Sequence, residues 1–341
     1  MNITRISRLA TVGAALALLL AAGTIAPTRA SAASGWTSQT TGTTQTLRAI
    51  TFANADRGWA VGDLGTIIAT IDGGVTWTAQ SSGTTMGLHA VSFTDVSSGW
   101  AVGAGATILS THDGGASWSA QIADVSADFA PFFTLAAVSF VDRVHGLAGG
   151  NSSFLQSTSD GGATWTRLVS SGQGCSSFSA FTGIQFIDGQ HAVGVGGHPS
   201  GITCRTADGG QTWSSTGLGS SLGLASPVHG PSFLDAANGW AVSGSNAIST
   251  NDGGATWALH PVRGASQLRA VSFIDARTGW VVGDGGAIFA TRNAGRSWSR
   301  VASGTDADLL GVSSVGAGRA WAAGSVGTIL ASARGGRPGT R

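Results

Sequence analysis

An eight-residue segment that recurs six times constrains this chain more than any other feature of its sequence. Each copy follows the pattern Thr-x-Asp-Gly-Gly-x-Thr/Ser-Trp, except the last, where Asn293 and Ala294 replace the Asp and the first Gly. The copies, called boxes below, are residues 70–77, 111–118, 158–165, 206–213, 250–257 and 291–298. Their third positions lie 41 to 48 residues apart. Turn-forming residues at a fixed offset within a period of about 40 to 50 residues are typical of β-propeller blades.

Each repeat also predicts its own strands. In the first full unit, short runs rich in β-branched and aromatic residues, punctuated by Gly, Asp and Asn, indicate strands A to D at residues 47–52, 59–62, 66–71 and 77–80. No segment after residue 35 has helical periodicity. The sequence therefore predicts an all-β domain of four-stranded blades.

The two ends of the repeat region complement each other. Residues 36–42 match the outer strand of the first unit, residues 77–83, whereas residues 309–332 supply three strands without a fourth. If the N-terminal strand completes the last blade, the ring closes and no sheet edge is left open. We therefore expect a seven-bladed β-propeller.

The boxes are expected to stabilise turns. A short Asp side chain accepts backbone N–H bonds in a tight turn, Gly supplies positive φ, and the Trp buries apolar area. The structural positions are Asp72, Asp113, Asp160, Asp208, Asp252, Asn293, Trp77, Trp118, Trp165, Trp213, Trp257 and Trp298. A calcium site is the alternative, but each turn offers one carboxylate where Ca²⁺ takes about six to eight oxygens. We expect no metal and no cofactor.

The N-terminus predicts export. Arg5 and Arg8 precede an apolar run at 9–26, and the small residues at 30–32 offer a cleavage site, so residues 1–32 are interpreted as a signal peptide. An uncleaved membrane anchor is the alternative. The predicted propeller then spans residues 33–335, and residues 336–341 form a short disordered tail. The protein would be secreted, periplasmic or lumenal, and membrane-associated if the signal is retained.

Composition limits the partners and the redox chemistry. The net charge is +1 and 10% of the residues are charged, so the sequence lacks the clustered basic face of a nucleic-acid-binding protein. The only two cysteines, Cys175 and Cys204, could form a disulfide in an exported protein or remain unpaired thiols.

The connections from strand D of one blade to strand A of the next are longer before blades three, four and five, and all of them are expected on one face of the propeller. They contain the aromatic residues Phe129, Phe132, Phe133, Phe178 and Phe181. Contiguous exposed aromatics mark a partner surface. The alternative is that these rings fold back over the blade tops as a satellite core.

The same face carries the entrance of the central channel. Arg48, His89, His229 and Arg269 occupy equivalent positions near the start of inner strands, which predicts a mildly basic entrance. Asp63 and Asp284, each in a Val-Gly-Asp-x-Gly turn, lie on the same rim. Solvated turn ends with weak local ion pairs are the alternative.

The repeat unit, most complete at residues 268–298, resembles the photosystem II stability/assembly-factor family of BNR (bacterial neuraminidase repeat) Asp-box propellers. The resemblance extends over residues 36 to about 333. It implies a non-catalytic, exported or lumenal scaffold that binds membrane-protein assembly intermediates through an Arg-rich patch, to which Arg48 and Arg269 correspond.

An enzyme is the competing interpretation. Sialidases share the boxes but need a Tyr nucleophile and a Glu partner, and the chain has neither residue. A glycosidase built on two of Asp63, Asp128 and Asp284 remains the alternative, as does a carbohydrate-binding module. We expect a monomeric protein-binding scaffold without enzymatic activity.

Overall fold

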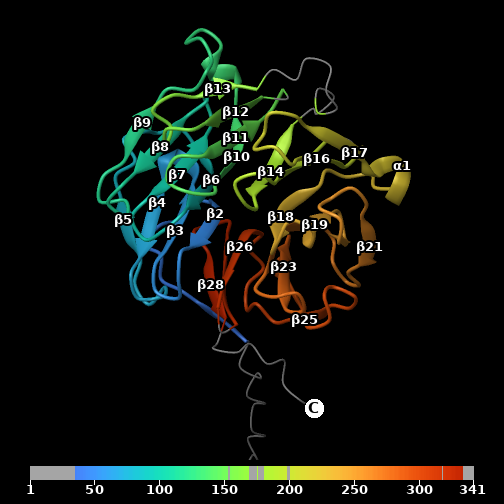
Figure 1. The fold of residues 1–341 in the computed structure, drawn as a ribbon. Coiled ribbons are helices and arrows are strands. Elements are labelled where there is room, and N and C mark those ends of the chain that lie inside the picture. The colour runs from blue at the N-terminus through green and yellow to red at the C-terminus, as the bar shows by residue number, and fades with distance from the viewer. Residues whose placement is uncertain are drawn as a thin grey trace, which may run out of the picture. The chain divides into compact units, whose positions relative to one another are not determined.

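In the computed structural model, each repeat forms a four-stranded antiparallel sheet, and the described residues contain seven such sheets (Figure 1). The structure describes residues 35–152, 154–168, 175, 180–197, 200–316 and 318–332. The predicted signal peptide and C-terminal tail lie outside the described residues. The all-β seven-bladed propeller predicted from the repeats is confirmed.

Strands A to D follow one another in the chain in blades one to six, whereas blade seven takes its strand D from β1. Blades one to three are β2 (Leu47–Phe52), β3 (Gly58–Gly62), β4 (Ile67–Thr70), β5 (Thr78–Gln80); β6 (Leu88–Phe93), β7 (Gly99–Gly103), β8 (Ile108–Thr111), β9 (Ser119–Gln121); and β10 (Leu135–Phe140), β11 (Gly146–Gly150), β12 (Leu155–Thr158), β13 (Thr166–Arg167). Blades four and five are β14 (Phe181–Phe186), β15 (Ala192–Gly196), β16 (Ile202–Thr206), β17 (Ser214–Gly217); and β18 (His229–Phe233), β19 (Gly239–Ser243), β20 (Asn246–Thr250), β21 (Ala258–Pro261). Blades six and seven are β22 (Leu268–Phe273), β23 (Gly279–Gly283), β24 (Ala287–Thr291), β25 (Ser299–Val301); and β26 (Leu309–Val315), β27 (Arg319–Gly324), β28 (Ile329–Ser332), β1 (Trp36–Ser38).

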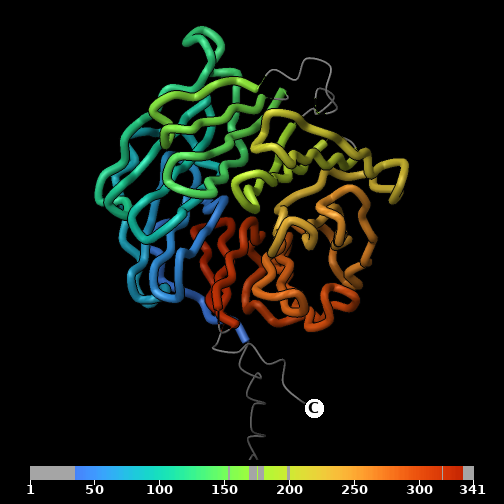
Figure 2. The backbone as a smooth tube through the Cα atoms, viewed as in Figure 1, coloured from blue at the N-terminus to red at the C-terminus, as the bar shows by residue number. Residues whose placement is uncertain are grey.

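The ring closes where the sequence predicts. β1 pairs antiparallel with β28, with Trp36 opposite Ser332, so the first described strand completes the last blade. Figure 2 shows this blue strand beside the red C-terminal strands. The inner strand β26 of blade seven also contacts β2 of blade one. Trp36 is 2% exposed, because the closure buries it in the core of the seventh blade.

Aromatic residues join neighbouring blades. Phe93, at the end of β6, stacks at 3.5 Å on Trp59 of the preceding blade and meets its own box Trp118 edge-on at 6.0 Å. The Trp59 indole N–H donates to the Gly114 carbonyl of the blade-two box at 2.9 Å. Gly99 is required beside this stack, because a Cβ there would lie 2.4 Å from the Phe93 ring. The same indole bond recurs at three other seams: Trp100 to Gly161, Trp240 to Ala294 and Trp321 to Gly73.

The connections divide into two faces, as the sequence predicts. In six of the seven blades the B-to-C turn bonds the preceding D-to-A connection, as in the Asp63 N–H to Thr46 carbonyl bond of 3.0 Å. Each box instead bonds its A-to-B turn, as in the Gly73 N–H to Asp56 carbonyl bond of 2.8 Å. We call the first set of turns the loop face and the second set the box face.

Short helices occur only in connections among the described residues, and the sequence did not predict them. They are η1 (Asp63–Gly65), η2 (Ala130–Phe132) and α1 (Leu218–Leu222). The last two lie in the longer D-to-A connections. None of the described helices is long and apolar enough to cross a membrane.

Candidate functional site

The boxes are closed hydrogen-bonded turns. In the first box, the Asp72 carboxylate accepts bonds from the Thr70 hydroxyl at 2.8 Å, the Thr76 N–H at 2.9 Å and the Thr76 hydroxyl at 2.6 Å. The side-chain and backbone bonds from Thr76 lower the pKa of Asp72 to about 2. The carboxylate oxygens are therefore occupied by their own turn.

The other boxes repeat this geometry. The pKa values of Asp113, Asp160, Asp208 and Asp252 are also lowered to about 2. Asn293 makes the same bonds with its amide, accepting from Ser297 N–H and donating to the Ser297 hydroxyl. No cluster of three or more His, Cys, Asp or Glu side chains suited to a metal occurs in the described part of the chain. The structural interpretation of the boxes fits these contacts.

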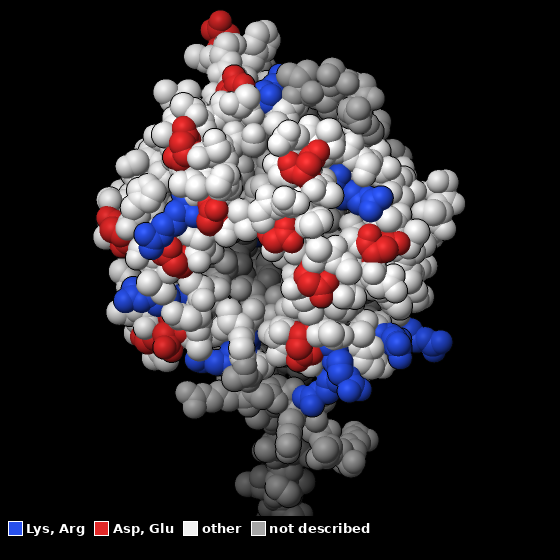
Figure 3. All heavy atoms as spheres, in the orientation of Figure 1, with Lys and Arg blue, Asp and Glu red and all other residues white. Residues whose placement is uncertain are grey.

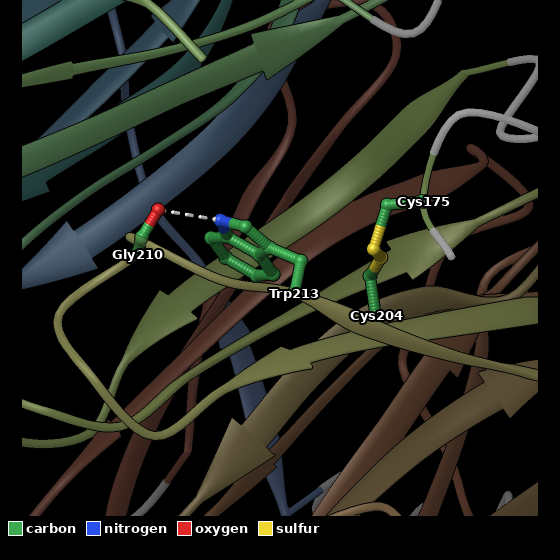
Figure 4. The surroundings of a disulfide bond; sticks show 4 residues. All are labelled: Cys175, Cys204, Gly210 and Trp213. Carbon is green, nitrogen blue, oxygen red and sulfur yellow. Dashed lines mark hydrogen bonds between the residues drawn. A yellow bond between two sulfur atoms is a disulfide. The ribbon is translucent and has the colours of Figure 1, made fainter. Parts of the chain in front are cut away.

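Cys175 and Cys204 form a disulfide with their Cα atoms 6.0 Å apart (Figure 4). The sequence left open whether these cysteines are bridged or free, and in the structure they are bridged. Cys204 lies in β16, and both residues are buried. The bridge ties the connection before blade four to that blade's third strand. Nearby, the Trp213 indole donates to the Gly210 carbonyl of its own box at 2.9 Å.

The channel entrance holds two matched ion pairs. Arg48 Nε lies 2.5 Å from the Asp63 carboxylate. Arg269 makes two bonds to Asp284, at 2.7 Å from Nε and 2.9 Å from Nη2. In both cases the Arg of strand A pairs with the Asp of the B-to-C turn in the same blade, so each Asp neutralises its Arg.

The two histidines of the entrance are uncharged at neutral pH. Burial, followed by the charge of Arg269, lowers the pKa of His229 to about 4. Burial and the nearby Arg48 also lower the pKa of His89, against the opposing effect of Asp63.

The predicted basic character of the entrance is therefore wrong, because its cations are paired and its imidazoles are neutral. Figure 3 shows one face of the molecule, on which acidic and basic side chains are interspersed. Whether Arg48, His89, His229, Arg269, Asp63 and Asp284 bind a partner stays a prediction.

The aromatic insertion between β9 and β10 presents two rings to solvent. Phe129 is 62% exposed and Phe132 is 74% exposed. Phe133 turns inward, with its ring 4.7 Å from that of Phe154, and Arg167 lies over both rings. The Asn151 amide holds the turn by donating to the Phe132 carbonyl at 3.0 Å. The exposed pair thus stands on an anchored segment.

Two other aromatics do not belong to this surface. Phe181, predicted in a connecting loop, is the first residue of β14 and is 1% exposed in the core of blade four. That placement corrects the prediction, and its cause is the early start of the inner strand. Phe178 lies outside the described residues.

A cavity of about 590 Å³ adjoins the aromatic pair. Its lining includes Ile122, Val125 and Ala130 of the insertion and Ile108 of β8. Ile122, 86% exposed, was missed in the sequence. The sequence does contain a signal for it. Ile122 lies four positions after the box Trp, where blade one has Ser81 and blade four has Gly217.

The fold and its boxes define a seven-bladed Asp-box β-propeller. The sequence profile of the family described as photosynthesis system II assembly factor YCF48 matches residues 28–120, 81–173 and 221–339, more than three quarters of the chain. The chain therefore belongs to this family. No curated protein sequence matches it significantly.

Solved structures share the fold. YCF48 bound to D1 peptide is 20% identical with a TM-score of 0.70, covering 87% of this chain and 94% of the other. YCF48 from Cyanidioschyzon merolae is 21% identical with a TM-score of 0.69, covering 87% and 98%. The GH74 xyloglucanase from Xanthomonas campestris is 12% identical with a TM-score of 0.60, covering 86% of this chain and 53% of that one. At these identities the likeness concerns the fold alone.

Proposed function

We propose that this chain is an exported, non-catalytic scaffold that binds an apolar segment of a protein partner through the aromatic insertion between β9 and β10. The observation that carries the proposal is the exposure of Phe129 and Phe132 on an anchored turn. Aromatic side chains beside a pocket supply most of the binding energy in many interfaces. A fixed backbone also reduces the entropy lost on binding.

The neighbouring apolar cavity extends this surface. Ile122 lies at its edge, and small side chains such as Ala127 and Ala130 leave room for a partner's side chain. Exposed apolar patches next to a groove mark interaction sites. Family membership and the YCF48 structure bound to D1 peptide favour a segment of a membrane protein as the occupant.

The entrance residues support a scaffold better than a glycosidase. A glycosidase needs two carboxyl groups on either side of a scissile bond, one of them protonated. Asp63 and Asp284 instead each form an ion pair with the Arg of their own blade, so both carboxylates are already engaged within the protein. Sialidase chemistry is further excluded by the absence of Tyr and Glu.

Affinity capture from native membranes, followed by mass spectrometry, tests the proposal. The Phe129→Ala/Phe132→Ala double variant should lose the membrane proteins that the wild type retains. Val75→Ala, which removes an apolar side chain of 74% exposure from the box face, is the matched control and should retain them. Equal capture by the aromatic variant would contradict the proposed surface, and loss with Arg48→Ala/Arg269→Ala alone would transfer the site to the entrance.

Export is tested separately. N-terminal sequencing of protein recovered from the native cell should give a chain that begins after Ala32. Recovery of the uncleaved chain from the membrane fraction would instead support the retained anchor.

A further inference from the structure

Blades three and four lack the indole of strand B. They carry Leu147 and Val193 where the other five blades carry Trp, and in blade four the residue paired with Val193 on β16 is Arg205. In every other blade the residue paired with this position is small: Ala69, Ser110, Ser157, Ser249, Ala290 and Ala331. Blade four thus combines an aliphatic and a cationic side chain where most blades combine an indole and a small residue.

The pairing determines where Arg205 points. Directly opposed residues of an antiparallel pair share one face of the sheet. Val193 packs in one cluster with Phe233 and Trp257 of blade five. Arg205 therefore projects into the seam between blades four and five.

A hollow of about 460 Å³ lies in this seam. Arg205, His191 and Ser214 line it from blade four, and Ala236 and Gly253 from blade five. A volume of this size lies within the range of about 300–1,000 Å³ that small-molecule sites occupy. Among the described residues, no indole of blade four donates to the blade-five box. The indole of that box, Trp257, donates to its own Gly254 carbonyl at 3.2 Å.

Arg205 has no hydrogen bond or ion pair with any described residue, although it is partly buried. Asp252 lines the same hollow, but its carboxylate accepts bonds from Thr250 and Thr256. By contrast, Arg143 on the box face pairs with Asp95 at 2.8 Å. Its guanidinium is therefore available to a ligand, and a charge-assisted bond from arginine to a carboxylate is among the stronger hydrogen bonds.

We infer that this hollow binds the carboxylate of a small organic acid, with Arg205 as its anchor. The planar guanidinium fork matches the two oxygens of a carboxylate. Ser214 adds a hydroxyl from the neighbouring strand. His191 holds Asp188 through Nδ1 at 2.9 Å, which leaves Nε2 without a partner among the described residues. The nearby Asp188 and Asp252 charges disfavour a phosphate group, which carries up to two negative charges at one place, relative to a carboxylate group, which carries one.

Chemical-shift titration of ¹⁵N-labelled protein with succinate tests the site, with inorganic phosphate as the comparison anion. The Arg205 Nε–H signal should shift saturably, and Arg205→Ala should bind succinate at least about tenfold more weakly. Arg277→Ala removes an exposed arginine from the box face of blade six and is the matched control. It should bind within about twofold of the wild type, because an exposed charge contributes little.

A second variant separates binding from folding. Val193→Trp/Arg205→Ser gives blade four the indole and serine pairing of blade five, so the protein should stay folded while the hollow is filled and succinate binding is lost. The inference is overturned if the wild type shows no saturable shift, if Arg205→Ala or the refilled variant binds as well as the wild type, or if phosphate binds more tightly than succinate.

Discussion

Removing an inter-blade indole should destabilise the propeller by an amount that depends on what replaces the ring. Trp100 is 0% exposed, stacks on Phe140 with centroids 3.5 Å apart, and donates to the Gly161 carbonyl at 2.9 Å. A buried aromatic removes about 150–250 Å² from water. At about 25 cal/mol per Å², this gives an upper estimate of about 4–6 kcal/mol. Trp100→Ala should therefore lower the free energy of unfolding by about 3–5 kcal/mol.

Trp100→Phe separates the ring from the N–H group. The Gly161 carbonyl keeps a second bond from the Gln121 amide at 3.0 Å, so this variant should cost about 1–2 kcal/mol. Trp321→Phe should cost more, since the Gly73 carbonyl accepts no other bond from the described residues. That carbonyl would lose its only partner, for a total of about 2–4 kcal/mol.

Urea unfolding followed by far-UV circular dichroism measures these differences, provided that the slope with denaturant stays constant. If Trp100→Ala lowers the free energy of unfolding by less than about 1 kcal/mol, neither the stacking nor the hydrogen bond of Trp100 stabilises the contact between these blades. Equal losses for Trp100→Phe and Trp321→Phe would show that the second donor, Gln121, has no effect.

Three further outcomes are expected. Folding lowers the pKa values of the box Asp residues from 3.8 to about 2. The stability that these carboxylates contribute is therefore complete above about pH 5 and is lost as the pH falls from 4 towards 2. Melting temperatures measured across this range check the prediction, and Asp72→Asn should make the melting temperature depend less on pH. Cys204→Ala should cost about 3 kcal/mol by opening a loop with a sequence separation of 29, and a reductant should then no longer lower the melting temperature. Deleting residues 1–38 should open the ring, which limited proteolysis of blade seven would detect, whereas an unchanged digestion pattern would contradict closure by β1.

The aromatic insertion illustrates a limit of sequence reasoning. The sequence located five Phe residues near the inserted connections, but only burial distinguishes exposed Phe129 and Phe132 from the anchored Phe133 and the core residue Phe181. Side-chain direction in a connection depends on contacts with other blades, here Phe154 and Asn151 of blade three. A single connection has no periodicity from which such contacts follow.

The sequence by itself determined the number of blades, the order of the strands within each blade, the closing strand and the two faces, because each repeat carries its own turn residues and alternation. Only the tertiary structure decided the charge of the channel entrance and which side chains meet between neighbouring blades. Pairing of Arg48 with Asp63 needs two segments of a blade to meet. The hollow beside Arg205 is lined by residues of blades four and five, so it exists only once the two sheets are packed together.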